Sequence, residues 1–121
     1  MAEGDQVLEQ PDERVRQLLS RILESATFPA SRELAAQIPF VRVTGGPVTM
    51  LDLTVEGGSR SAAQDGPIRV RVAVSRGVGD LTGELLIWIK DGYLSCLEFA
   101  WVTDDRPENL PSPNELEILD G

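Results

Sequence analysis

The chain contains no histidine and a single cysteine, and these two shortages exclude several kinds of site. Without an imidazole there can be no histidine general base, no serine-histidine-aspartate triad and no histidine metal ligand. Cys96 alone cannot form an internal disulfide or a thiolate metal cluster, which favours a reducing compartment. We therefore expect a cytoplasmic protein that holds no metal or other cofactor.

Long apolar runs and an excess of basic residues are also missing. The longest aliphatic-rich run, Leu85 to Ile89, is far shorter than the roughly 20 residues of a membrane span. The first residues are acidic where a secretory signal would be basic. Eleven Lys and Arg oppose twenty Asp and Glu, so the net charge is −9, which repels phosphate backbones and anionic lipid headgroups. We expect neither nucleic acid nor a membrane as a partner.

The hydrophobic residues change their spacing once, near residue 40. The chain has 121 residues, 41% of them hydrophobic, which suits one domain over residues 1–121. Residues 40–103 alternate with a period of two, as half-buried strands do. Residues 11–38 follow a helical period, with a main stripe at Val15, Leu18, Leu19, Ile22 and Leu23. We predict an α+β fold in which N-terminal helices cover one face of a mainly antiparallel sheet of four or five strands.

The two ends of the chain are expected to be less regular. Residues 104–121 contain one basic and six acidic residues, with prolines at 107, 111 and 113. Prolines at this spacing favour extended chain outside a ladder, so we predict an extended, acidic, proline-containing tail there. Residues 1–10 are expected to be flexible.

The last two strands should form a hairpin around Asp91-Gly92, a dipeptide that suits a two-residue turn because both positions need positive φ. In that register, opposed residues have numbers that sum to 183, as 91 and 92 do. One side is then aliphatic and carries Leu85, Ile87, Ile89, Leu94, Cys96 and Glu98. The other side carries Trp88, Phe99 and Trp101 together with Leu86 and Leu97. Both sides are apolar, so the hairpin needs two covers.

The helices can cover the aliphatic side, which leaves the aromatic side to be explained. We favour the interpretation that Leu110 and the prolines of the tail cross it and shield it from water. The alternatives are a ligand or another protein chain on that side. If another protein chain covers that side, the tail, which begins at Asp104 and Asp105, is partly free and docks on a basic partner.

Glu98 is the first candidate for chemistry, because a carboxylate on the aliphatic side would have a raised pKa or an arginine partner. The favoured alternative is that it is solvated near the sheet margin or paired with Arg69 or Arg71. Asp104 and Asp105 could act with Glu98 as acid and base. Two acids after a strand are more often turn formers, which is the interpretation we favour.

Three further features have a structural and a functional interpretation. Cys96 is expected to be a buried structural thiol, because a nucleophile would need a nearby base and an electropositive setting. The segment Gly77-Val78-Gly79-Asp80 has no helix after it, so it predicts a strand connection instead of a phosphate loop. Four arginines could hold an anion, although local ion pairs are favoured in so acidic a chain. They are Arg42, Arg60, Arg69 and Arg71.

Five short segments follow one another between residues 28 and 119. They are Glu33-Leu34-Ala35-Ala36-Gln37-Ile38, Phe40 to Gly45, Leu51-Asp52-Leu53, Asp91 to Glu98, and Leu110-Pro111-Ser112-Pro113. Their order resembles a family of small bacterial proteins, mainly actinobacterial, with no known activity. Many members carry closely spaced cysteines in the segment that corresponds to Gly45 to Met50 of this chain. Those cysteines are missing here, so the resemblance implies no metal or redox role. The hairpin segment DGYLSCLE also resembles bacterial proteins encoded near toxins, which implies an immunity or antitoxin role.

These observations favour binding over catalysis. No metal set, phosphate loop or nucleophile with a base can be assembled, so we expect no enzymatic activity. We expect a protein-interaction module that binds itself or a basic partner. Its candidate contact residues are Trp88, Phe99, Trp101, Glu98, Asp104 and Asp105. The alternatives are a small-ligand-binding protein with a pocket between helix and sheet, or a carboxylate enzyme around Glu98.

Overall fold

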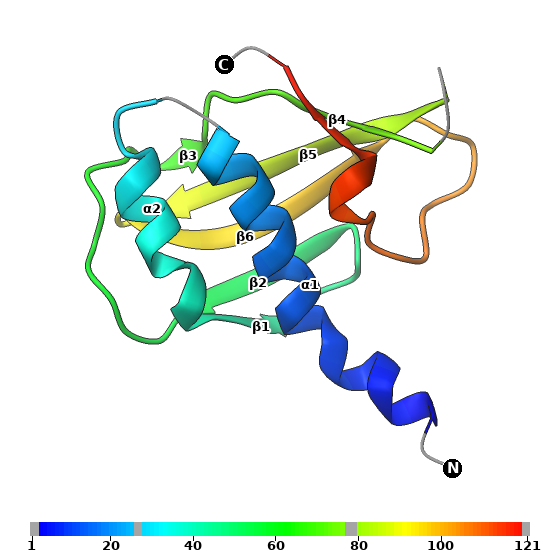
Figure 1. Cartoon of the computed structure of the whole chain (residues 1–121), viewed down its shortest axis with the longest axis horizontal. Coiled ribbons are helices and arrows are strands. Elements are labelled where there is room, and N and C mark those ends of the chain that lie inside the picture. The colour runs from blue at the N-terminus through cyan, green and yellow to red at the C-terminus, as the bar shows by residue number, and fades with distance from the viewer. Residues whose placement is uncertain (1–2, 26–27, 77–79, 120–121) are drawn as a thin grey trace.

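Two helices lie on one face of a sheet in the computed structural model of the chain, which describes residues 3–25, 28–76 and 80–119 (Figure 1). The predicted α+β class and the mainly antiparallel sheet are confirmed. The described residues form seven strands, more than the four or five expected, in the order β1-β2-β6-β5-β4-β7 with β3 paired to β5. The elements are α1 (Glu3–Ser25), α2 (Ser31–Gln37), the 3₁₀ turn η1 (Ile38–Phe40), β1 (Val41–Gly45), β2 (Met50–Val55), β3 (Gly66–Pro67), β4 (Val72–Ser75), β5 (Leu81–Lys90), β6 (Tyr93–Trp101), η2 (Pro113–Glu115) and β7 (Leu116–Ile118).

Helix α1 packs on the sheet through the stripe read from the sequence. Its buried side chains are those of Val15, Leu18, Leu19, Ile22 and Leu23. Burying each such side chain stabilises the fold by about 1.5–3 kcal/mol relative to leaving it exposed. The helix begins at Glu3, so residues 3–10 are helical where we expected flexible chain. Pro11 therefore lies inside the helix, where it lacks the N–H of an intrahelical bond.

The same helix closes the β1 edge of the sheet. The Arg16 guanidinium donates to the carbonyl oxygen of Val41 at 2.7 and 3.1 Å. The Asp12 carboxylate accepts a hydrogen bond from the Val43 N–H at 2.8 Å. Free backbone groups on an edge strand invite pairing with other chains, and these two side chains occupy such groups on β1.

The sheet face toward the helices is aliphatic, and it forms the core together with α1 and α2. One row of paired residues across this face consists of Val72, Leu85 and Phe99. The next row consists of Leu51, Leu97 and Ile87. All six side chains are buried. We call this the inner face and the opposite one the open face.

The β5–β6 hairpin has the predicted turn but not the predicted register. Asp91 and Gly92 have φ of 54° and 84°, and Ile89 pairs with Leu94 as expected. A β-bulge between Trp88 and Ile89 then shifts the pairing by one residue, so that Trp88 faces Cys96. The Ser95 hydroxyl donates to the Trp88 carbonyl at 3.2 Å beside this shift. An extra residue in one strand moves the side chains beyond it to the opposite face of the sheet.

This shift corrects the predicted faces of β6. Leu97 and Phe99 lie on the inner face, and Phe99 is 1% exposed, so it does not belong to an aromatic patch with Trp88. Cys96 and Glu98 lie on the open face instead of the aliphatic side. The physical reason is the cost of burying a charge, because the uninterrupted register would have placed the Glu98 carboxylate in the apolar core.

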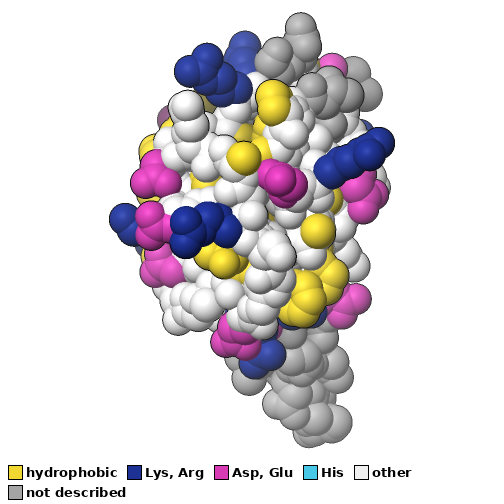
Figure 2. All heavy atoms as spheres, turned by 90° about the vertical axis from the view of Figure 1, so that its left-hand side faces the viewer, with side chains coloured by type: hydrophobic (Ala, Val, Ile, Leu, Met, Phe, Trp, Pro, Cys, Tyr) yellow, Lys and Arg dark blue, Asp and Glu magenta, His cyan; other side chains and the backbone are white. Residues whose placement is uncertain are grey.

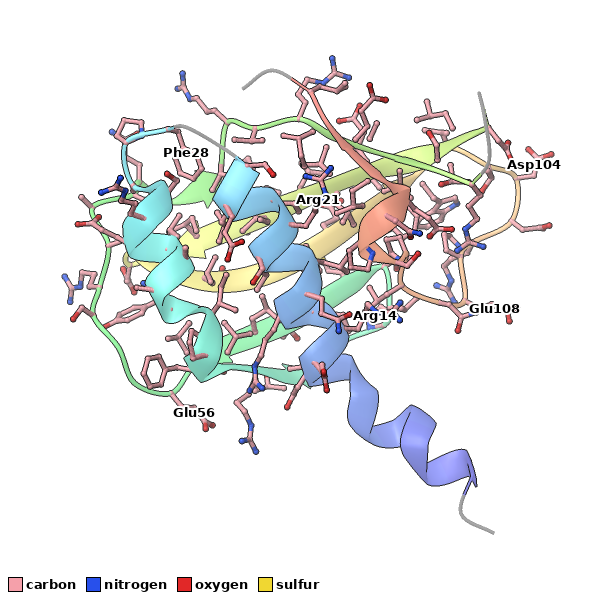
Figure 3. All side chains as sticks on the ribbon, viewed as in Figure 1. Arg14, Arg21, Phe28, Glu56, Asp104 and Glu108 are labelled. Atoms are coloured by element: carbon pink, nitrogen blue, oxygen red, sulfur yellow. The ribbon has the colours of Figure 1, made fainter. Side chains whose placement is uncertain are left out.

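The tail also differs from the prediction of an extended chain across the aromatic side. Leu116 to Ile118 pair with β4 as the strand β7, and Leu116 is buried. Before it, the Glu115 carboxylate accepts a hydrogen bond from the Ser112 N–H at 2.9 Å. Figure 3 shows Arg14 on the side of α1 toward η2, and its guanidinium donates to the Pro111 carbonyl at 3.2 Å. The tail therefore packs beside α1 and on the sheet edge, and it does not cover the open face.

Candidate interaction surface

The open face is the side of the sheet that no described helix covers, because α1, α2 and η2 all lie on the other side (Figure 1). Its central row runs across β2, β6 and β5 as Asp52, Cys96 and Trp88. The neighbouring row consists of Met50, Glu98 and Leu86. The alternation of each strand therefore brings a tryptophan, two aliphatic or thioether side chains, a thiol and two carboxylates onto one surface.

The apolar side chains of this surface are partly accessible. Met50 is 42% exposed, and Leu86, Trp88, Cys96 and Ala100 are half-buried. Partly exposed apolar groups from adjacent strands of one sheet face are typical of protein contact surfaces. The open face therefore contains the tryptophan expected for a contact surface, although it lacks Phe99 and Trp101.

Glu98 is held at the middle of the open face by a side-chain hydrogen bond. The Trp88 indole Nε1–H donates to Glu98 Oε1 at 3.0 Å, across the two strands of the hairpin. We had expected a solvated or arginine-paired carboxylate, or a desolvated one on the aliphatic side. The carboxylate is half-buried and has an indole as its partner. The bond restrains the indole and one carboxylate oxygen in a defined relative position.

Cys96 is half-buried on the open face, and not enclosed among Ile87, Ile89 and Leu94 as expected. Burial raises the pKa of its thiol to about 11, with smaller contributions from the carboxylates of Asp52 and Glu98. Its Sγ lies 3.3 Å from the thioether sulfur of Met50. The thiol is therefore protonated near neutral pH, and its acidic surroundings are the opposite of those that activate a nucleophilic cysteine.

The other predicted site residues do not gather around Glu98. Asp104 and Asp105 lie on an exposed loop beyond the end of β6, as Figure 3 shows for Asp104. The Thr103 hydroxyl donates to the Asp105 carbonyl at 2.9 Å, a local bond of the kind that stabilises turns. Within residues 3–25, 28–76 and 80–119 there is no group of three acidic or cysteine side chains placed to hold a metal ion.

Trp101 lies at the far end of the hairpin, away from the Trp88 row. It pairs with Gly83, and it is 39% exposed beside the exposed side chains of Leu81 and Val102. A Cβ added to Gly83 would collide with the Ala100 carbonyl oxygen and lie 2.9 Å from the Phe99 ring, so the glycine allows the two strands and the ring to approach closely. The three predicted aromatic contact residues thus occupy three environments: the open face, the core and the hairpin end.

Two of the four arginines that could have held an anion form local ion pairs instead. Arg71 contacts the Glu84 carboxylate at 2.8 Å, and Arg42 lies 3.7 Å from Asp12. These two ion pairs agree with the favoured interpretation. Arg60 and Arg69 are exposed. Of the glycine-rich segment 77–80, residues 77–79 lie outside the described residues.

A groove of about 740 Å³ lies between the start of α2 and the segment 62–69. Its walls include the apolar Phe28, Ala63 and Ile68, together with the charged Glu33, Asp65 and Arg69. Figure 2 views this end of the molecule and shows its hydrophobic side chains in small groups separated by charged ones. This groove is the feature that corresponds to the alternative of a ligand pocket between helix and sheet.

Sequence reasoning missed the role of Gln37, which is 1% exposed at the end of α2. Its side-chain Nε2 donates to the carbonyls of Gly92 at 2.9 Å and Ser59 at 3.0 Å. Its Oε1 accepts a hydrogen bond from the Leu94 N–H at 3.0 Å. The carboxamide thus bonds to β6 as the peptide group of a neighbouring strand would. The available signal was its position three residues after Leu34, on the inward side of the helix.

No protein-family model, curated protein or solved structure matches this chain. In the part of the chain that the structure describes, no helix is both long enough and apolar enough to cross a bilayer.

Proposed function

We propose that this protein is a non-catalytic protein-interaction module that binds through the open face of its sheet. The observation that carries the proposal is the central Trp88, which is half-buried on a sheet face that no described helix covers. Tryptophan is enriched at the energetic centres of interfaces, and the flexible Met50, two strands away on the same face, can adapt to a partner surface. The partner is a second copy of the chain or a basic protein.

The chemistry of the open face supports binding more than catalysis. Its thiol has a pKa raised to about 11, and Glu98 is engaged by an indole N–H instead of a second carboxylate. Asp104 and Asp105, the proposed acid-base partners of Glu98, lie on a separate loop. We place the protein in the cytoplasm, and an immunity or antitoxin role is one setting in which such a module would act.

The test compares Trp88→Ala with the wild type by light scattering and by affinity capture from lysate of the native cell. Wild type should form a dimer or retain a defined protein, and Trp88→Ala should lose that association. Trp101→Ala is the matched control, since it removes the same side chain from the hairpin end. A monomeric wild type that retains no protein, or an association that Trp88→Ala leaves intact, would contradict the proposal.

The groove beside α2 supports small-ligand binding as a second candidate function. Its apolar walls suit a small apolar ligand, and the carboxylates of Glu33 and Asp65, which outnumber the cation of Arg69, favour an amine over an anion. Thermal unfolding with a panel of aromatic and aliphatic amines tests this. Saturable stabilisation that Ile68→Arg abolishes would favour it over the interaction module, and no stabilisation by any member of the panel would exclude this ligand class.

A further inference from the structure

We propose that the open face binds a basic protein segment, with an arginine side chain of the partner between Asp52 and Glu98 and over Trp88. This inference rests on the proposed function and names the partner of the same surface. It selects one of the two partners considered there and gives the chemistry by which that partner is recognised.

Two carboxylates on the open face make no ion pair with the described part of the chain. Glu84 is neutralised by Arg71, and Asp12 by Arg42, whereas the ion pairs of the described residues include neither Asp52 nor Glu98. Both carboxylates are close enough to Cys96 to raise the pKa of its thiol, which shows that they act on the same point of the surface. The centre of the apolar face therefore carries two carboxylates that no described arginine or lysine pairs with.

The geometry of the sheet suits a guanidinium at this point. Asp52 and Glu98 are diagonal neighbours on β2 and β6, a relation that places side chains about 7–8 Å apart. Glu98 Oε1 is used by the Trp88 indole, and its second oxygen remains able to accept a bond. A planar guanidinium can donate to both carboxylates while its face stacks on an indole, and its aliphatic stem can contact Met50.

A second copy of the chain fits this surface less well. Two copies joined through their open faces would enclose both pairs of Asp52 and Glu98 carboxylates in one interface, where like charges are costly. Each copy also carries a net charge of −9, which slows their encounter and accelerates that of a cationic partner. Charge therefore selects a basic partner from the two classes that an apolar face alone would allow.

The experiment is an NMR titration of the ¹⁵N-labelled full chain with an amidated five-residue peptide that alternates arginine and leucine. The Trp88 indole N–H should shift saturably, and the Trp101 indole, at the hairpin end, should not. The control peptide has glutamate in place of arginine and should leave both indoles unmoved. Equal shifts with both peptides, or no shift at millimolar arginine peptide and low salt, would overturn the inference.

Two variants with the same net charge separate recognition at this point from general attraction. Asp52→Asn with Glu98→Gln should weaken binding of the arginine peptide by about fivefold for each charge removed, as loss of about 1 kcal/mol per ion pair implies. Asp104→Asn with Asp105→Asn removes the same charge from the exposed loop and should leave the affinity within about twofold of wild type. Equal weakening by both variants would reduce the effect to net charge and would overturn the inference.

A third variant places a cation on the open face, where it competes with the arginine of the peptide. Met50→Lys places an ammonium opposite Glu98 on the neighbouring strand, and it should weaken the arginine peptide without unfolding the chain, since Met50 is 42% exposed. Unweakened binding in a folded Met50→Lys protein would count against the assignment. If wild type is a dimer that Trp88→Ala dissociates, and the arginine peptide shifts no indole, the basic partner is excluded while the interaction module stands. If Trp88→Ala alters no association, the module itself fails.

Discussion

Replacing Gln37 with leucine tests how α2 holds the β5–β6 hairpin in place. Leucine keeps a similar volume in a position that is 1% exposed, but it cannot donate or accept a hydrogen bond. The change removes the bonds to the carbonyls of Ser59 and Gly92 and the bond from the Leu94 N–H. The hairpin turn then loses its polar attachment to the helix.

The three lost bonds differ in cost because the groups left behind differ in their access to other partners. The Leu94 N–H is left without a partner next to the core, which costs about 1–3 kcal/mol. The Gly92 carbonyl keeps a hydrogen bond from the Ser61 N–H at 2.9 Å, and Ser59 is exposed to water. Each of those two losses is worth about 0.5–1.5 kcal/mol. We expect the free energy of unfolding to fall by about 2–6 kcal/mol in total.

Urea unfolding followed by tryptophan fluorescence measures this change, provided that the m-value stays constant. Gln17→Leu on the exposed side of α1 is the matched control and should change the free energy of unfolding by less than about 0.5 kcal/mol. Hydrogen exchange adds a local measurement, because the Leu94 amide should exchange faster in Gln37→Leu. A wild-type unfolding midpoint in Gln37→Leu, or a Leu94 amide as protected as before, would refute this account of Gln37.

Phe99→Ala should lower the free energy of unfolding by about 3–5 kcal/mol in a urea titration, because Phe99 is buried in the core. Trp101→Ala should lower it by less, since Trp101 is partly exposed, and equal losses from the two variants would contradict the shifted register. Gly83→Ala should destabilise the protein by about 1–3 kcal/mol, seen as a lower Tm, because its Cβ would collide with the Ala100 carbonyl oxygen and lie 2.8 Å from the Trp101 Cα; an unchanged Tm would show that β5 and β6 can separate there. Cys96 should react slowly with iodoacetamide near neutral pH and faster as the pH approaches its pKa of about 11, and Asp52→Asn should lower that pKa. Because folding raises this pKa above the ordinary thiol value of 9.0, the thiol's contribution to stability should be lost as the pH rises from 9.0 to about 11. A comparison of urea midpoints with Cys96→Ala would detect this loss.

Local patterns in the sequence predicted the elements whose formation depends on nearby residues. The stripe from Val15 to Leu23 is a property of one helix, and it is buried as expected. The Asp91-Gly92 turn depends on two backbone conformations, and both have positive φ. The change of period near residue 40 correctly separated the helices from the strands, which is why the α+β class could be predicted. Ion pairs such as that of Arg71 with Glu84 followed from the excess of acidic residues.

Features that depend on residues distant in the sequence were decided by the tertiary structure alone. The bulge beside Trp88 keeps the Glu98 carboxylate off the face that the helices cover, and that covering is made by residues outside the hairpin. The pairing of the tail with β4 satisfies backbone groups that exist only once the sheet has formed. Gln37 is useful only because folding brings its carboxamide to the Leu94 N–H, 57 residues away. The open face with Trp88, Asp52 and Glu98 arises in the same way, since a one-residue shift in pairing exchanges the two sides of a strand.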